Sequence, residues 1–373
     1  MPCMDSGRRP RAVIISASFG AGHDGAATEL TRRLQVLGFG VDRHDFVDLM
    51  PRRAGVLLRG LYRRQLTFAP QSWGWFLTLA GRDRFAKQSA DATAMADRAT
   101  MAAVGTGADL VLSTYPLASQ VLGRLRRTGQ LAVPVVTYLT DMSVHRLWVA
   151  DGIDVHLALH DEPAGQAKEH GATDVRVIAP AVDPAFGAAP SASARARWGL
   201  PRRSPLALLV AGAWGVGSVA RAAADIAATG LAVPVVACGR NDVLRQRLRR
   251  ADHSIALGWV DDMASLMHSC QIVVQNAGGL SSLEALSARV PVVTYRCLPG
   301  HGRTNATGLD QAGWVPWIRS RGDLARGLSA ALSAPSRFVP AAAQPESVLA
   351  ELAGRGCPRP ASSSTRDNYT VSR

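Results

Sequence analysis

The sequence has few charged residues and no long apolar segment, and both absences narrow the classes of protein to consider. Of its 373 residues, 47% are hydrophobic and only 19% are charged, which suffices for two globular domains with separate cores. No run approaches the roughly eighteen apolar residues of a membrane-spanning helix. The N-terminus is charged but no apolar signal-peptide core follows it, so we expect a cytoplasmic protein.

Paired cysteines are also missing. The five cysteines are odd in number, scattered and without a C-x-x-C pair; they are Cys3, Cys238, Cys270, Cys297 and Cys357. This distribution is typical of a reducing compartment. It argues against a disulfide framework and against a zinc site.

Acidic residues are outnumbered, 29 against 42 Lys and Arg, which gives a net charge of +13. Such an excess favours polyanionic partners or is simply the composition of an arginine-rich chain. Residues 51–81 contain five arginines and no acid. Trp73, Trp75 and Phe76 follow the arginines within this segment. We predict that the segment from Arg52 to Phe76 contacts an anionic membrane surface, although an ordinary helix pair fits as well. Nucleic acid is not expected, because the basic residues are spread along the chain without an aromatic recognition motif.

Short apolar runs alternate with helical patterns along the whole chain, which predicts an α/β fold with parallel sheets. Ten runs have the length of strands: 12–16, 41–47, 108–114, 133–139, 154–159, 206–212, 233–239, 254–259, 271–276 and 290–295. An Ala/Pro/Ser-rich stretch between the fifth and the sixth of these runs divides the chain. We predict a first domain over residues 1–185, a linker over 186–204, a second domain over 205–332, and a partly disordered tail over 333–373 with a short helix from Glu346 to Gly354.

A glycine-rich loop, "SASFGAGHDGAA", follows the first apolar run. Gly20, Gly22 and Gly25 match the G-x-G-x-x-G spacing of a dinucleotide-binding loop, whose helix N-terminus binds phosphate. An acid at Asp42, Asp45 or Asp48 could then hold the ribose of NAD. This alternative does not explain His23 in the middle of the loop.

A second glycine turn lies in "QNAGGLSSLEALSARVPVV". Gly278 and Gly279 allow close approach of an anion to the following helix, where Ser281 and Ser282 add hydroxyl donors. Glu284, one turn later, can accept bonds from ribose hydroxyls. Alternatively, Ser281 and Glu284 form a capping box and merely start the helix.

These motifs together resemble the monogalactosyl- and diglucosyl-diacylglycerol synthase family, relatives of the glycosyltransferase that makes lipid II. The resemblance runs from about residue 12 to about residue 315, through "SASFGAGHDGAA", "STYPLASQVL", "TYLTDMSVHRLWVADGID", "VVACGRND", "LGWVDDMASLMHSCQIVVQNAGG" and "PGHGRTNA". It implies the GT-B fold, two Rossmann-like domains with parallel sheets facing a central cleft. It also implies an inverting transfer of a hexose from a UDP-sugar to a lipid-type acceptor, without metal or cofactor, by a peripheral protein at the inner face of the cell membrane.

The resemblance assigns roles to residues on both sides of the cleft. His23 is the expected catalytic base, because imidazole titrates near neutral pH, and Asp141 is the second candidate for base or orienting group. The acceptor side comprises Gly20, Gly22, His145 and Trp148. The donor side comprises Gly212, Gly215, Gly217, Trp259, Val260, Asn276, Gly278, Gly279, Ser281, Ser282, Glu284, His301 and Asn305.

Departures from the family pattern leave alternatives open. Family members usually carry glutamine and often an acid where this chain has His301 and Gly302, and often lysine at Asn276. These changes put the donor sugar in doubt. A catalytically weak GT-B scaffold, a nucleotide-sugar epimerase and, more remotely, an NAD-dependent oxidoreductase are the alternative functions.

Overall fold

The computed structural model describes residues 8–18, 21–51, 54, 55, 57, 60, 91–189, 193–333 and 338–354. Within these ranges no helix combines the length and the apolar character needed to cross a membrane. The proposed membrane segment from Arg52 to Phe76 lies almost entirely outside the described residues, and so does residue 20.

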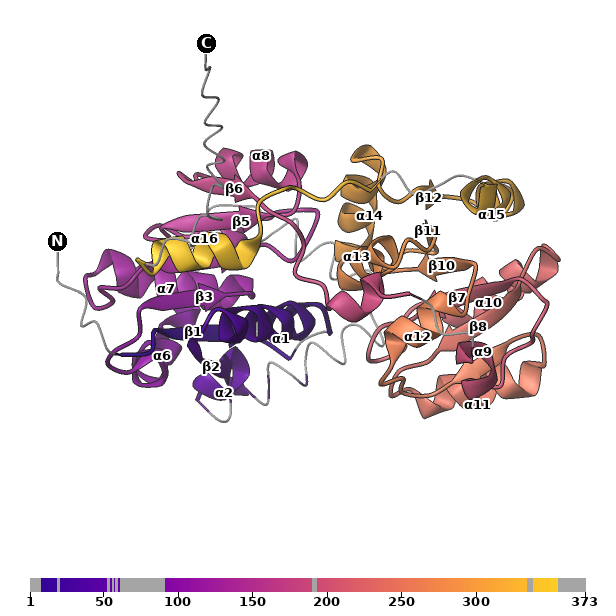
Figure 1. Ribbon diagram of the computed structural model, residues 1–373, viewed down its shortest axis with the longest axis horizontal. Coiled ribbons are helices and arrows are strands. Elements are labelled where there is room, and N and C mark those ends of the chain that lie inside the picture. The colour runs from indigo at the N-terminus through magenta and orange to yellow at the C-terminus, as the bar shows by residue number, and fades with distance from the viewer. Residues whose placement is uncertain are drawn as a thin grey trace, which may run out of the picture.

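Each half of the chain forms a sheet of six parallel strands (Figure 1). The first sheet has the order β2-β1-β3-β4-β5-β6, with β1 (Arg11–Ser16), β2 (Gly40–Asp45), β3 (Leu110–Ser113), β4 (Val135–Tyr138), β5 (Val155–Ala158) and β6 (Val175–Val177). The second has the order β12-β11-β10-β7-β8-β9, with β7 (Leu206–Val210), β8 (Val233–Ala237), β9 (Ile255–Leu257), β10 (Ile272–Gln275), β11 (Val292–Tyr295) and β12 (Trp317–Ile318). The predicted α/β class with parallel sheets is therefore confirmed.

Helices connect the strands, as right-handed crossovers between parallel strands require. Around the first sheet lie α1 (Ala21–Val36), α2 (Phe46–Leu49), η1 (Thr93–Ala96), α6 (Asp97–Val104), α7 (Pro116–Arg127), η2 (Arg146–Trp148) and α8 (Asp161–Glu169). The remaining helices are η3 (Pro184–Gly187), α9 (Ala194–Arg197), α10 (Val219–Ala228), α11 (Asp242–Ala251), α12 (Met263–His268), α13 (Leu280–Ser287), α14 (His301–Gln311), α15 (Leu324–Ser333) and α16 (Pro345–Leu352).

The strand predictions differ from the structure in two respects. The run 41–47 ends as a strand at Asp45, because the Asp45 carboxylate accepts a hydrogen bond from the Val47 N–H at 2.9 Å and caps α2. The short edge strands β6 and β12 were not predicted. With three and two residues, they are too short to form a recognisable apolar run.

The C-terminal helix α16 returns to the first domain and packs beside α1 (Figure 1). Its Leu349 side chain is completely buried, in a cluster that also holds Leu30 of α1 and Leu283 of α13. Part of the segment expected as a tail thus belongs to a core shared by the two halves of the chain. The apolar positions of α16 explain this, since a helix buries such a stripe against whatever surface is within reach.

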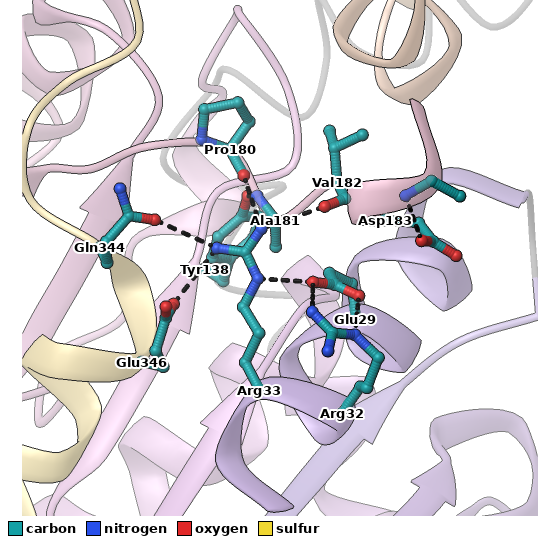
Figure 2. A network of polar contacts seen from close by, with 11 residues as sticks. Glu29, Arg32, Arg33, Tyr138, Pro180, Ala181, Val182, Asp183, Gln344 and Glu346 are labelled. Atoms are coloured by element: carbon teal, nitrogen blue, oxygen red, sulfur yellow. Dashed lines mark hydrogen bonds and ion pairs between the residues drawn. The ribbon is translucent and has the colours of Figure 1, made fainter. Parts of the chain in front are cut away.

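Arg33 of α1 joins the two places where the chain crosses between the halves (Figure 2). Its guanidinium donates to the carbonyl oxygen of Val182 at 3.0 Å and to the Glu346 carboxylate at 3.2 Å. Glu29 accepts a further bond from Arg33 Nε at 2.6 Å. The Arg33 side chain is only 14% exposed. These partners supply the hydrogen bonds that a cation loses with its water on burial.

His156 on β5 is a buried histidine in the middle of the first sheet. It is 1% exposed, and neither ring nitrogen has a hydrogen-bond partner among the described residues. Burial lowers its pKa to about 4, although the neighbouring Asp174 acts in the opposite direction.

We expect His156 to make the fold sensitive to acid. In the unfolded chain His156 binds a proton below pH 6.5, whereas in the folded chain it does so only below about pH 4. The free energy of unfolding therefore falls by about 3 kcal/mol as the pH drops through this window. Urea unfolding between pH 4 and pH 7 measures the change. His156→Gln should flatten this part of the pH dependence, because a glutamine side chain has no proton to titrate. An unchanged slope in His156→Gln would contradict the assignment.

Candidate active site

A cavity of about 340 Å³ lies between the two halves of the chain. The first half lines it with the start of α1 and the loop after β4, and the second half with the loops after β7, β8, β9, β10 and β11. These loops follow the carboxyl ends of parallel strands, where open α/β sheets bind ligands. In the part of the chain that is described, no three His, Cys, Asp or Glu side chains are grouped to hold a metal ion.

His23, near the start of α1, lines this cavity. Its Nδ1 lies 2.7 Å from the carbonyl oxygen of Thr114 and 3.1 Å from Thr140 Oγ1. Because a carbonyl oxygen only accepts, Nδ1 carries the proton and donates it. In the neutral ring, Nε2 is therefore the basic nitrogen. The ring packs edge-on against Tyr115 and, tilted, against Trp148, with centroids 5.4 Å and 5.9 Å away.

Asp141 follows β4 and lines the same cavity. The residue is only 6% exposed. Its Oδ1 accepts a hydrogen bond from the Asn305 amide of α14 at 3.1 Å. Asp141 and His23, far apart in the sequence, are therefore brought together at one wall.

The glycines around His23 are used differently from those of a dinucleotide loop. Gly22 lines the cavity, but Gly25 contacts Leu280 of α13, and a Cβ at residue 25 would collide with the leucine side chain. Two of the three acids that would hold a ribose are engaged elsewhere, Asp42 with Arg11 at 2.6 Å and Asp45 with the α2 N-terminus. At residue 25, therefore, glycine allows close packing between the two halves of the chain.

The second glycine turn forms the opposite wall. Gly278 and Gly279 have φ of +76° and +68°, a conformation that favours glycine. Gly279 precedes the first helical residue, Leu280, and no side chain caps the helix. The capping-box alternative for Ser281 and Glu284 is therefore wrong. Leu280 and Ser281, in the first turn of α13, line the cavity instead.

Glu284 lines the cavity one turn into α13. Burial raises its pKa to about 7, and the nearby Asp183 acts in the same direction. A carboxyl group in this environment gains most from a ligand that donates hydrogen bonds to it, because such donors favour the ionised form.

The loop after β9 supplies an aromatic wall. Trp259 is 49% exposed, and its indole N–H donates to Asp261 at 2.7 Å. The Arg240 guanidinium lies 4.6 Å from the ring centroid, within range of a cation–π contact. Asn276 donates to the carbonyl oxygen of Val216 at 3.0 Å, which ties the loop after β10 to the turn after β7.

Two family models match the chain in turn. Residues 23–180 match monogalactosyldiacylglycerol (MGDG) synthase, and residues 207–333 match glycosyl transferases group 1. The chain is a glycosyltransferase, and its first half is similar to MGDG synthase. Among curated relatives, the processive diacylglycerol beta-glucosyltransferase of Bacillus cytotoxicus is 24% identical over 336 residues, 85% of this chain and 84% of the relative. The enzyme of the same name from Bacillus pumilus is 28% identical over 58% of each chain.

Solved structures identify the architecture as GT-B. MurG of Acinetobacter baumannii superposes with a TM-score of 0.51 at 17% identity, covering 92% of this chain and 93% of MurG. Sucrose-phosphate synthase from Thermosynechococcus elongatus gives 0.57 at 16% identity, covering 88% and 90%. The predicted GT-B fold is confirmed, and the oxidoreductase alternative is excluded because the chain is a glycosyltransferase.

Most predicted donor-side residues of the glycosyltransferase line the cavity. They are Gly212, Trp259, Val260, Asn276, Gly278, Gly279, Ser281 and Glu284. Gly215 and Gly217 do not; they shape the turn by packing against the Cys238 carbonyl oxygen and against Leu298. Ser282 does not either, since it is fully buried and lies about 100° around the helix from Ser281.

Three further predicted residues, Asn305, Trp148 and His145, are not among the described residues that line the cavity. Asn305 is fully buried and bonds the loop after β4. Trp148 is 1% exposed and contributes its contact with His23, and His145 packs on Trp148 with centroids 6.2 Å apart. The side chain of His301 is not described. At Gly302, a Cβ would come 2.9 Å from Leu298 Cβ, so Leu298 packs closely against this glycine.

Three contributors were missed. Thr140 bonds His23 from the residue before Asp141, and its place beside a predicted catalytic residue was the available signal. Leu280 fills the space above Gly25, and Arg240 covers Trp259. No local sequence pattern predicts these last two contacts, because each joins segments that are distant in sequence.

Proposed function

We propose that this glycosyltransferase is an inverting enzyme that transfers a hexose from a UDP-sugar to a hydroxyl group of a lipid-type acceptor, a diacylglycerol or a polyprenyl-linked glycolipid. The observation that carries the proposal is the shared cavity, which His23 and Asp141 line from one half of the chain and Gly279, Ser281 and Glu284 from the other. The names of the relatives, diacylglycerol beta-glucosyltransferases, support the acceptor class.

In the proposed reaction the acceptor hydroxyl attacks the anomeric carbon from the side opposite the leaving group. One C–O bond forms as the bond between the anomeric carbon and the diphosphate oxygen breaks, which inverts the configuration. His23 Nε2 takes the hydroxyl proton, and the bond from Nδ1 to Thr114 holds the ring in the required tautomer. UDP leaves with the bonding electron pair. General base catalysis of this kind typically contributes about 10² to 10⁴ in rate.

The first turn of α13 stabilises the negative charge that develops on UDP as it leaves. The helix dipole and the backbone N–H groups of a helix start favour an anion at this position, and Ser281 adds a hydroxyl donor. We assign the diphosphate to this turn without a metal ion. Glu284 accepts the ribose hydroxyls, and the base lies against the Trp259–Val260 loop. An Anabaena protein of similar fold, 14% identical with a TM-score of 0.51 over 87% of this chain and 90% of its own, has been solved with UDP-glucose.

The acceptor approaches from the first domain, beside Gly22 and the residues that pack on His23. We propose that the protein works as a peripheral protein at the inner face of the cell membrane, and that the Arg/Trp segment from Arg52 to Phe76 holds it there. Five arginines without an acid in residues 51–81 suit an anionic lipid surface.

The test is a transfer assay with vesicles that contain diacylglycerol or a polyprenyl-phosphate-linked glycolipid, a panel of UDP-hexoses, and EDTA in a parallel series. We expect one donor and acceptor pair to yield a hexosyl lipid whose anomeric configuration, determined by NMR, is opposite to that of the donor. EDTA should leave the rate unchanged.

Each alternative predicts a different product. Conversion of one UDP-hexose into another without acceptor would indicate an epimerase. Tight UDP-glucose binding without transfer to any acceptor would indicate a scaffold, and transfer that stops in EDTA would contradict metal independence.

A further inference from the structure

Asn305 of α14 is a fully buried side chain that reaches across to the other half of the chain. Its Oδ1 accepts the Met142 N–H at 2.9 Å, and its Nδ2 donates to Asp141 Oδ1 at 3.1 Å. The Met142 N–H is a donor and can pair only with the amide oxygen of Asn305, so the NH₂ group must face the Asp141 carboxylate. The orientation of the amide therefore follows from its partners.

Neighbouring contacts fix α14 against the loop after β4. Thr304 Oγ1 accepts a hydrogen bond from Ser143 Oγ at 2.9 Å. At Gly308, one turn after Asn305, a Cβ would collide with the Met142 carbonyl oxygen. The backbones thus approach more closely than any side chain at 308 would allow, and this approach brings the Asn305 amide within reach of Asp141.

The geometry points to Asn305 as a positioning residue for Asp141. By donating to Oδ1, the amide holds the carboxylate at the cavity wall and favours its ionised form, and it does so only when the second domain is docked on the first. Asn305 thereby couples domain docking to the readiness of the acceptor side. This inference rests on the proposed function, in which Asp141 acts as base or orients the group that does.

Other ionisable groups near Asp141 come from three elements. His23 of α1 and Glu284 of α13 line the same cavity, and Arg303 of α14 is exposed two residues before Asn305. The Asn305 amide is uncharged, so replacing it by a carboxylate of the same shape changes the charge next to Asp141 while the other three groups stay in place.

Asn305→Asp is the decisive variant. It preserves an acceptor for the Met142 N–H but replaces the NH₂ donor by a carboxylate beside Asp141. Like charges at this distance raise a pKa, so we expect the acidic limb of the pH profile of kcat/KM to move upward by about one unit or more. Thr307→Val removes a hydrogen bond within α14, from Thr307 Oγ1 to the Arg303 carbonyl oxygen at 3.0 Å, and its profile should match that of the wild type.

A measurement without turnover separates this inference from the proposed function. In protein with ¹³C-labelled aspartate, the Asp141 carboxyl signal is identified by its loss in Asp141→Asn and followed against pH in the wild type and in Asn305→Ala. We expect Asp141 to titrate at higher pH in Asn305→Ala. If the titration moves but no sugar transfer is ever observed, the proposed function fails and the role of Asn305 stands. If neither the titration nor the acidic limb moves, Asn305 only packs the interface and the inference is overturned.

Discussion

Replacing His23 by alanine should lower the rate of sugar transfer by about 10² to 10⁴-fold while the affinity for UDP-glucose stays within about twofold. The reason is positional. His23 lines the cavity from the first domain, whereas the glycine turn and Glu284 line it from the second. Calorimetry with UDP-glucose and a transfer assay with saturating acceptor measure the two quantities separately.

His23→Asn is the matched control for structural damage. The asparagine amide can still donate to the Thr114 carbonyl oxygen, which His23 Nδ1 reaches at 2.7 Å, but it cannot take up a proton near neutral pH. Both variants should therefore lose transfer equally. Recovery of activity in His23→Asn would show that the hydrogen bond to Thr114 matters and that Asp141 is the base.

Replacing Glu284 by alanine should weaken UDP-glucose binding by about 10 to 100-fold, the usual contribution of hydrogen bonds to a charged group. The pKa of Glu284 is raised to about 7 by burial and then by Asp183. Ribose hydroxyls favour the ionised carboxylate, so binding should strengthen as the pH rises from 6 to 8 and should release protons at pH 7. Calorimetry in two buffers of different ionisation enthalpy detects this release.

The choice of ligand and the isosteric variant make this result specific. UDP-glucose is preferred to UDP because a terminal phosphate itself titrates near pH 6. Glu284→Gln keeps the shape but cannot ionise, so its affinity should be lower than that of the wild type at pH 8 and independent of pH. A pH dependence that persists in Glu284→Gln would assign the titration to another cavity residue, and equal affinity at pH 8 would exclude Glu284 as the ribose ligand.

The sequence predicted correctly those features that depend on the residues of a single segment. The buried run of β7, "LALLV", and the glycine turn before α13 indicate a strand and an anion-compatible helix start, because period, length and glycine content are local properties. The resemblance to the MGDG synthase family joined His23, Asp141 and Glu284 into one site, and all three line one cavity. Local reasoning failed at Ser281 and Glu284, where the local pattern alone favoured a capping box and a glycine precedes the helix instead.

By itself, the sequence determined the α/β class, the positions of most strands along the chain and the segments that face the cavity. Only the tertiary structure decided that Gly25 makes room for Leu280 rather than for a pyrophosphate, that Asn305 bonds Asp141, and that α16 packs on α1. Each of these contacts joins segments far apart along the chain. A residue's own neighbours fix its backbone preference and burial pattern, but its partner across a domain junction follows from how the two sheets dock.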